Sequence, residues 1–200
     1  MPRVVSGKAG GINLDAPKGL KTRPTADKVK EAVFSIISFQ IHGSRFLDAF
    51  AGTGQIGIEA LSRGADSVVF IDQSKESASF IKQNLKKTRL EENAIVMMED
   101  VSSSILKLKG TKPFDIVYMD PPFDGAISTF KSVVKLLLQY KILSENAVVI
   151  LEHRSEDAPC EFVMNLKLKK SCKYGTIMVS FYDVANLYLT DHEAVATYSK

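Results

Sequence analysis

The sequence predicts an α/β protein with a mostly parallel, seven-stranded sheet, helices on both of its faces and an antiparallel hairpin near the C-terminal end. Two observations lead to this expectation. Short apolar segments alternate with helical segments from about residue 45 to residue 152, which is typical of parallel strands joined by crossover helices. After Glu152 this alternation stops, and two strand-like segments follow one another directly.

The expected elements follow from hydrophobic spacing and from the residues at their ends. Residues 1–24 are rich in Gly and Pro and predict an arm, with short strands at Val4–Val5 and Ile12–Leu14. A helix is expected over residues 25–38, because Pro24 precedes it and apolar residues recur at helical spacing. The later expectations are strands at 45–50, 67–72, 94–98, 114–119 and 146–152, helices at 74–87, 101–108 and 126–140, a short helix ending near Gly64, and hairpin strands at 162–171 and 176–184 with their turn at 173–175.

Length and composition exclude several classes of protein. A chain of 200 residues with 45% hydrophobic and 24% charged residues is expected to form one globular domain with a sufficient core. No apolar run reaches the ~18 residues of a membrane helix, and the first residues lack a secretory signal core. Cys160 and Cys172 lack metal-type spacing, and His42, His153 and His192 are scattered. We therefore expect a cytoplasmic monomer with no metal and no membrane contact.

Positive charge is concentrated at the N-terminal end. Residues 1–30 contain seven Lys and Arg against two Asp, whereas the net charge of the whole chain is +3. The remaining residues therefore carry a slight negative charge. A basic segment of this kind suits a polyanionic partner such as RNA, although a solvated lysine-rich surface would have the same composition.

A glycine-rich segment between the first expected strand and the next helix indicates a nucleotide site. Gly52, Gly54 and Gly57 match the pattern G-x-G-x-x-G, and Asp72 lies 20 residues after Gly52, at the end of the next strand. Glycines permit close approach of the backbone to a ligand, and the carboxylate can accept hydrogen bonds from ribose hydroxyls. A tight turn alone would explain the glycines but not their position between a strand and a helix.

Carboxylates at strand ends indicate which nucleotide binds. Asp48, Asp72, Asp100 and Asp120 each end or follow a parallel strand, so we expect all four to line one crevice. They would repel the pyrophosphate of a dinucleotide and attract a cation. S-adenosylmethionine combines an adenosine with a sulfonium and an ammonium group, and the sequence therefore predicts this cofactor. Its carboxylate could be bound by Arg23 or by loop amides, and each Asp taken singly could instead cap a helix.

The fourth parallel strand ends in Asp120-Pro121-Pro122-Phe123. In the strand order 3-2-1-4-5 this segment lies opposite the glycine-rich loop. An Asp carboxylate and a Pro carbonyl can accept both hydrogens of an amino group, which directs the nitrogen lone pair at an electrophilic methyl. Phe123 offers a ring on which a flipped base could stack. In isolation the segment would also be consistent with a simple turn.

These motifs resemble a known family. D-P-P-F, together with L-D-A-F-A-G-T-G-Q-I-G-I-E-A-L-S-R-G-A upstream, is similar to the amino-group methyltransferases that use S-adenosylmethionine. The stretches T-R-P-T-A-D-K-V-K-E-A-V-F and K-Y-G-T narrow the resemblance to the RsmD family, the 16S rRNA guanine-N2 methyltransferases. It covers about residues 3–183 and implies a Rossmann-like class I methyltransferase fold. It also implies rRNA methylation at a guanine of the assembling small ribosomal subunit, by direct displacement and without metal.

The resemblance implies roles for individual residues. Arg23, Pro24 and Thr25 match an arm that closes over the cofactor and helps to meet RNA. The tetrapeptide Asp120, Pro121, Pro122 and Phe123 is implied to be catalytic. The residues implied to hold the cofactor are Arg23, Thr25, Asp48, Phe50, Gly52, Gly54, Asp72, Gln73, Asp100, Val101 and Asp120.

The expected organisation is an arm and helix over residues 1–40, a methyltransferase domain over 41–184, and a tail over 185–200 with no assigned role.

Three alternatives differ in the activity that they assign to the protein. The acceptor could be a DNA base or a protein glutamine, although 200 residues leave no room for a large DNA-recognition domain, and glutamine acceptors more often accompany Asn-Pro-Pro-Tyr. A non-catalytic RNA-binding assembly factor is disfavoured by the four retained carboxylates. A nicotinamide dehydrogenase is disfavoured by Asp48 and by the lack of a His, Lys and Tyr acid constellation.

Overall fold

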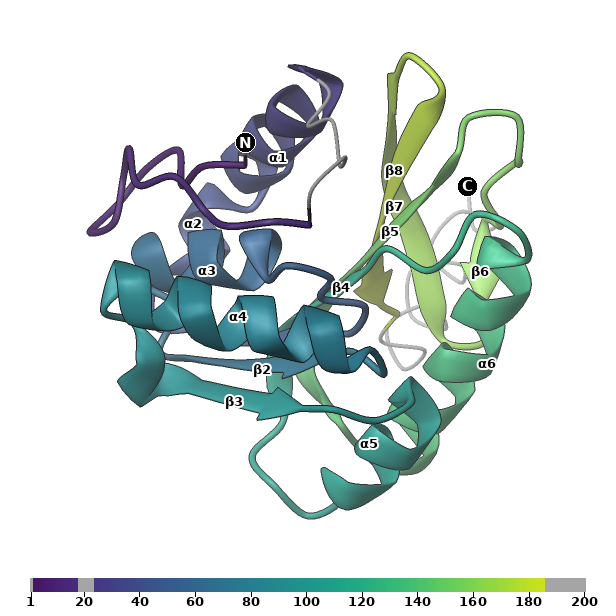
Figure 1. Cartoon of the computed structure of the whole chain (residues 1–200). Coiled ribbons are helices and arrows are strands. Elements are labelled where there is room, and N and C mark those ends of the chain that lie inside the picture. Colours follow the sequence, from purple (N-terminus) through teal and green to yellow (C-terminus); the bar gives the residue numbers. More distant parts are fainter. Residues whose placement is uncertain (1, 18–23, 186–200) are drawn as a thin grey trace, which may run out of the picture.

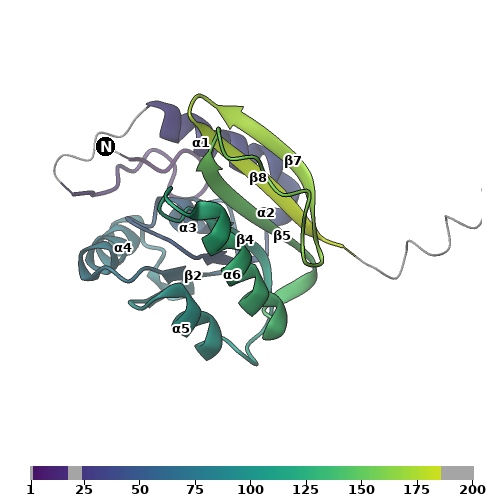
Figure 2. The same cartoon turned by 90° about the vertical axis from the view of Figure 1, so that its right-hand side faces the viewer.

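A single eight-stranded sheet forms the centre of the computed structural model, which describes residues 2–17 and 24–185, without the side chains of residues 24–26 (Figures 1 and 2). The strand order is β3-β2-β1-β4-β5-β8-β7-β6, so the expected order 3-2-1-4-5 of the parallel part is confirmed. The parallel strands are β1 (Arg45–Asp48), β2 (Ser67–Ile71), β3 (Ala94–Met97), β4 (Phe114–Met119) and β5 (Leu143–Arg154), and the antiparallel extension consists of β6 (Phe162–Val163), β7 (Leu166–Tyr174) and β8 (Ile177–Val184).

Helices cover both faces of the sheet, as expected (Figure 1). One face is covered by α1 (Pro24–Ile36), α2 (Ser38–Ile41), α3 (Gln55–Ser62) and α4 (Lys75–Thr88). The other face is covered by α5 (Val101–Lys107) and α6 (Ala126–Gln139), and a single turn η1 (Glu91–Asn93) precedes β3. These elements alternate with β1–β5, which confirms the α/β class.

The central strands are buried on both faces. In β2, Val68 and Phe70 belong to the apolar cluster under α3 and α4, whereas Val69 and Ile71 belong to the cluster under α5 and α6. Side chains of a strand alternate between the two faces, so a strand covered on both sides must be apolar at every position. This requirement explains the continuous apolar runs that made the parallel strands recognisable in the sequence.

The C-terminal extension differs from its expected form. The sheet has eight strands rather than seven, because the expected strand 162–171 is interrupted where Val163 pairs directly with Leu166. Met164 at this turn has a φ of 56°. β7 also extends to Tyr174, so the turn before β8 lies at residues 175–176 and begins with Gly175 at a φ of 65°.

Three other boundaries also differ from expectation. β5 is longer than 146–152, because pairing with the antiparallel β8 continues to Arg154. The expected helix over 25–38 is divided into α1, which ends at Ile36, and α2, which begins at Ser38. The arm contains no regular strand among residues 2–17, where Arg3 and Asn13 form one isolated antiparallel bridge.

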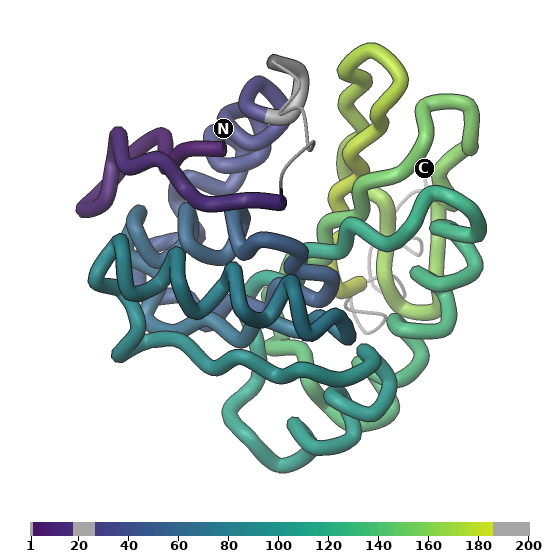
Figure 3. Tube along the Cα trace, viewed as in Figure 1, coloured from purple at the N-terminus to yellow at the C-terminus, as the bar shows by residue number. Residues whose placement is uncertain are grey.

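A buried carboxylate attaches the arm to α3, and the arm can be followed across that helix in Figure 3. Glu59 is fully buried, and its oxygens accept hydrogen bonds from the backbone N–H of Val5 at 2.7 Å and of Ser6 at 3.1 Å. Arg63 Nε lies 2.7 Å from Glu59 Oε1, and Lys30 Nζ lies 3.6 Å from Glu59 Oε2. The same buried carboxylate therefore binds the backbone of the arm and pairs with Lys30 and Arg63.

Lys30 corrects the expectation that residues 1–30 form a basic surface. Its side chain is only 1% exposed, and its ammonium group donates a hydrogen bond to the carbonyl of Arg3. Burial lowers the pKa of Lys30, while the nearby Glu59 carboxylate opposes that change. Because Lys30 neutralises an internal charge, it is not available to an external polyanion.

Candidate active site

A pocket of about 590 Å³ opens at the carboxyl ends of β1, β2 and β4. Ligands of open α/β sheets bind at this edge, where the strand order changes direction. The volume lies within the range of about 300–1,000 Å³ that is usual for small-molecule sites. The pocket is lined by Ala49, Phe50, Gly52, Ile71, Asp72, Gln73, Ser74, Glu99, Asp100, Val101, Asp120, Pro121, Pro122 and Phe123.

The three glycines of the loop after β1 have different structural roles. Gly52 and Gly54 adopt φ values of 54° and 79°, which glycine reaches at little cost. Gly57 has no such φ, but a Cβ there would lie 2.3 Å from the ring of Phe70. The first two glycines therefore shape the turn, and Gly57 lets α3 pack closely on β2.

Asp48 lies beneath this loop and does not line the pocket, contrary to the expectation that four carboxylates line one crevice. Its side chain is 2% exposed, and Oδ2 accepts a hydrogen bond of 3.0 Å from the N–H of Gly57. That N–H belongs to the first turn of α3, where backbone donors lack helical partners. Burial raises the pKa of Asp48 to about 7, and Asp72 adds to this rise, whereas the Gly57 N–H opposes it.

Asp72 connects the end of β2 to the glycine loop. Its Oδ2 accepts a hydrogen bond of 2.8 Å from the N–H of Gly52, and its Oδ1 accepts one of 2.8 Å from the N–H of Ser74. A carboxylate oxygen can accept more than one hydrogen bond, so Asp72 can still receive donors from the pocket. Gln73 and Ser74 line the wall beside it.

Asp100 both caps a helix and lines the pocket. Its Oδ1 accepts hydrogen bonds from the N–H groups of Ser102 and Ser103 at the start of α5, at 2.9 and 3.0 Å. Hydrogen bonds from the Ser103 side chain and backbone hold the pKa of Asp100 below its usual range. Asp100 is therefore the N-cap that its position after a strand would suggest, and it also lies in the pocket beside Val101 and Glu99.

Asp120 follows β4 and lies among other acidic groups on the α3 side of the sheet. Tyr118, two residues earlier, pairs in register with Asp48 of β1, and its Oη donates a hydrogen bond of 2.5 Å to Glu152 Oε2 of β5. The Asp120 side chain lines the pocket and is exposed to it. Partial loss of solvent around the carboxyl, together with the charges of Glu152 and Asp48, raises the pKa of Asp120 well above its usual value.

Phe123 forms the outer wall of the pocket and is 40% exposed. The guanidinium carbon of Arg154 lies 5.8 Å from its ring centroid, and Arg154 Nη2 lies 2.9 Å from Asp124 Oδ1. Phe123 also lines a second hollow of about 240 Å³, which includes Arg154 and Thr176. The aromatic ring is therefore accessible from the side away from the glycine loop.

The structure places most of the sequence-derived site residues around one pocket. Asp48 and Gly54 are buried and are not among its lining residues. Arg23 lies outside the described residues, as does the side chain of Thr25. The lining includes Phe50, Gly52, Asp72, Gln73, Asp100, Val101, Asp120, Pro121, Pro122 and Phe123.

Several residues near the site were not assigned from the sequence. Glu99 and Ser74 line the pocket, and each stands directly beside a residue that was assigned. Glu152 has no recognisable signal in the sequence, because only the pairing of β4 with β5 brings it to Tyr118. His153 lies outside the pocket lining, where it is buried and its Nε2 lies 2.9 Å from Ser180 Oγ.

Within residues 2–17 and 24–185, no three His, Cys, Asp or Glu side chains are grouped so that they could hold a metal ion. In the same part of the chain, no helix is both long enough and apolar enough to cross a membrane.

Comparison with known proteins gives consistent matches over nearly the whole chain. A family model described as Conserved hypothetical protein 95 matches residues 2–183. YlbH of Bacillus subtilis is 36% identical over 181 residues, covering 90% of this chain and 97% of its own. Ribosomal RNA small subunit methyltransferase D of Haemophilus influenzae is 33% identical over 181 residues, covering 90% and 92%. The solved structure of yhhF from Escherichia coli is 28% identical with a TM-score of 0.80, covering 92% of this chain and 97% of that one.

Proposed function

Since the chain belongs to the family described as Conserved hypothetical protein 95, the RsmD family, we propose that it transfers a methyl group from S-adenosylmethionine to the exocyclic N2 amino group of a guanine in 16S rRNA. The observation that carries the proposal is one pocket with two chemically different sides. Asp72 and Asp100 line its inner side, and Asp120-Pro121-Pro122-Phe123 forms its outer wall. We propose that the enzyme acts as a monomer on the assembling small ribosomal subunit.

The inner part of the pocket fits the proposed cofactor. Asp72, Asp100 and Val101 all line the pocket, which supports a role for Asp72 in accepting hydrogen bonds from the ribose hydroxyls and for Asp100 and Val101 in contacting the adenine. Asp72, Glu99 and Asp100 line this part of the pocket, and their carboxylates would attract a positively charged ligand. S-adenosylmethionine supplies an electrophilic methyl on a positively charged sulfur.

The outer wall would orient the acceptor. The Asp120 carboxylate and the Pro121 carbonyl can accept the two amino hydrogens, and the two prolines fix the φ angles of the backbone that carries them. The nitrogen lone pair is then free to form the new N–C bond, while the base stacks on Phe123. The amino proton becomes acidic only as the methyl adds, so orientation contributes more than proton abstraction, and Asp120 can hold the released proton before water removes it.

A methylation assay tests the proposal directly. The protein is incubated with S-adenosylmethionine carrying a labelled methyl group and either naked 16S rRNA or small ribosomal subunits that lack the modification. We expect label in N2-methylguanine at one position of the RNA. Label in another base, or none in either substrate, would contradict the proposed function.

Replacing Asp72 by alanine is expected to weaken cofactor binding. The lost hydrogen bonds to a charged group correspond to about 1.5–3 kcal/mol of binding free energy. Isothermal titration calorimetry with S-adenosylmethionine measures the loss, and NAD is the comparison ligand. Asp72→Asn is the matched control, because it retains one acceptor for the Gly52 N–H and should lose less affinity. Equal affinity in Asp72→Ala and the wild type would remove Asp72 from the cofactor site, and tighter binding of NAD would argue against a methyltransferase.

Replacing Phe123 by alanine is expected to weaken engagement of the acceptor base. A stacking ring contributes about 1–3 kcal/mol per base, so KM for the RNA should rise more than the Kd for the cofactor. Steady-state kinetics and cofactor calorimetry separate the two effects. Phe123→Tyr keeps the ring and should retain the wild-type KM. An unchanged KM in Phe123→Ala would show that the base does not stack there.

A further inference from the structure

Strand β7 carries a dense positive charge on the edge side of the sheet. Its nine residues, Leu166–Tyr174, include Lys167, Lys169, Lys170 and Lys173 and no Asp or Glu. β6 pairs only with Leu166 and Lys167, so within the described residues no strand pairs with the outer side of β7 from Lys169 to Tyr174. The net charge of the whole chain is only +3, which makes this strand exceptional in the sequence.

The four lysines differ in their partners. Lys169 Nζ lies 2.7 Å from Asp183 Oδ2, and Lys167 Nζ lies 5.8 Å from the ring centroid of Phe162. Lys170 and Lys173 are exposed and form no ion pair with any described residue. Lys170 pairs with Phe181 and Lys173 with Met178, so the two side chains project from opposite faces of β7. Both ammonium groups are therefore available to an anionic partner that runs along the sheet edge and contacts both faces.

The end of β7 lies beside the acceptor side of the pocket. Tyr174 pairs with Ile177 of β8, and Ile177 pairs with Arg154 at the end of β5. The hollow of about 240 Å³ next to Phe123 includes both Arg154 and Thr176. The turn of the β7–β8 hairpin therefore flanks the ring that closes the pocket, and β7 leads away from it along the sheet edge (Figure 2).

We propose that the outer edge of β7, from Lys173 to Lys167, is a docking strip for the sugar-phosphate backbone of the substrate RNA. This inference rests on the proposed function. The seven residues from Lys167 to Lys173 are separated by six steps of extended strand, which span about 20 Å. One strand of a duplex carries about six phosphates over that length. The exposed Phe162 stands beside Lys167 at the far end, and aromatic rings beside cations are surfaces on which bases stack.

Acidic side chains beside Phe123 pair with Arg154, so the strip begins at Lys173 and does not include Arg154. Arg154 is engaged by Asp124 at 2.9 Å and by Glu156 at 3.5 Å, so the guanidinium next to Phe123 is already neutralised. Phosphates are therefore expected to contact Lys173 and Lys170, while a base enters the pocket past Phe123. Lysines on an edge strand also prevent pairing between protein molecules, but that role alone would not require the strip to begin at the active site.

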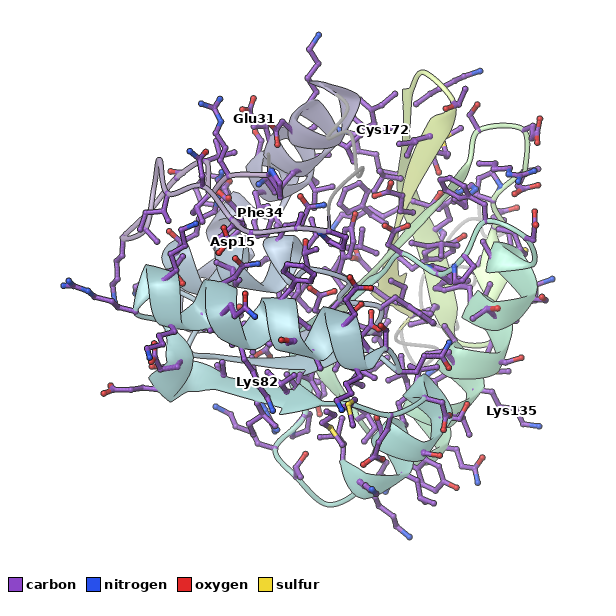
Figure 4. The ribbon with its side chains drawn as sticks, in the orientation of Figure 1. Asp15, Glu31, Phe34, Lys82, Lys135 and Cys172 are labelled. Atoms are coloured by element: carbon purple, nitrogen blue, oxygen red, sulfur yellow. The ribbon has the colours of Figure 1, made fainter. Side chains whose placement is uncertain are left out.

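Salt-dependent RNA binding tests the strip. The double variant Lys170→Gln, Lys173→Gln is compared with Lys82→Gln, Lys86→Gln on α4. Both control lysines are exposed, and α4 lies on the side of the sheet that ends in β3, far along the strand order from β7. Figure 4 labels Lys82 on α4 and Cys172 on β7, well apart in that view. Fluorescence anisotropy with a labelled 16S rRNA transcript gives Kd at several salt concentrations.

The β7 variant is expected to bind RNA more weakly, and its log Kd should depend less on log salt. Each lost phosphate contact reduces that slope by about 0.7–0.9. Two contacts therefore reduce it by about 1.4–1.8. The α4 control should match the wild type, and both variants should keep the wild-type affinity for S-adenosylmethionine.

The outcomes separate the strip from the proposed function. If the wild type methylates rRNA and the β7 variant keeps the wild-type slope and Kd, the strip is wrong and the function stands. If only binding to assembled subunits weakens while binding to the naked transcript does not, β7 contacts a protein and the RNA strip is again wrong. Failure of the wild type to methylate any RNA contradicts the function, whereas the binding slopes still decide whether β7 contacts RNA.

Discussion

Replacing Asp120 by alanine is expected to lower the rate of methyl transfer by about 10²–10⁴-fold, which is the usual effect of losing a positioning or acid–base group. Asp120 lines the pocket together with Pro121 and Pro122, on the side that we propose receives the acceptor. The substitution removes an interaction with the acceptor amine, so cofactor affinity should change much less than the rate. Single-turnover kinetics with saturating cofactor measure the chemical step.

Asp120→Asn distinguishes the two roles that this carboxylate could have. Asparagine keeps one acceptor oxygen but presents an NH₂ donor where the second oxygen stood. If orientation is the role, Asp120→Asn should retain partial activity at every pH. If Asp120 must take up the proton, this variant should be nearly as slow as Asp120→Ala. Full activity in Asp120→Ala would rule out the tetrapeptide as the catalytic site.

The pH dependence of the wild type provides a second measurement. Partial loss of solvent around the carboxyl, with the charges of Glu152 and Asp48, raises the pKa of Asp120. A protonated carboxyl accepts hydrogen bonds poorly, so the rate should fall as the pH decreases through that raised pKa. The decline should therefore begin at a higher pH than an ordinary Asp would produce. It should be absent from the profile of Asp120→Asn, which has no proton to gain at this position.

Replacing Glu59 by alanine is expected to reduce the free energy of unfolding by about 3–5 kcal/mol, the usual cost of leaving a buried charge without its partner. Glu59 is fully buried between α3 and the arm. Its loss leaves Lys30 without a counter-charge and the N–H groups of Val5 and Ser6 without acceptors. Urea unfolding followed by circular dichroism measures the change.

Two further variants show whether charge is the cause. Glu59→Gln keeps a hydrogen-bond acceptor and should lose less stability than Glu59→Ala. Adding Lys30→Met to Glu59→Gln should recover part of the loss, because neither side chain then leaves an isolated charge in the core. Wild-type stability in Glu59→Ala would show that the arm is held mainly by its apolar residues, such as Val4 and Leu14.

Features that depend on neighbouring residues could be predicted from the sequence. Strands buried on both faces must be apolar at every position, so β1–β4 were recognisable as short apolar runs between helices. The backbone needs glycine at Gly52 and Gly54, and the spacing to Asp72 matches one strand, one helix and the next strand. These local requirements also placed Asp120-Pro121-Pro122-Phe123 at the edge of the sheet where the glycine loop lies.

Features that depend on contacts between distant residues became visible only in the folded structure. Asp48 accepts a hydrogen bond from the first turn of α3, which holds it under the loop rather than in the pocket. Packing of the arm on α3 made Lys30 an internal cation of Glu59. Pairing of β5 with both β4 and β8 brought Glu152 to Tyr118 and the hairpin turn to Phe123. Such contacts join residues that lie tens of positions apart in the chain, so hydrophobic spacing does not predict them.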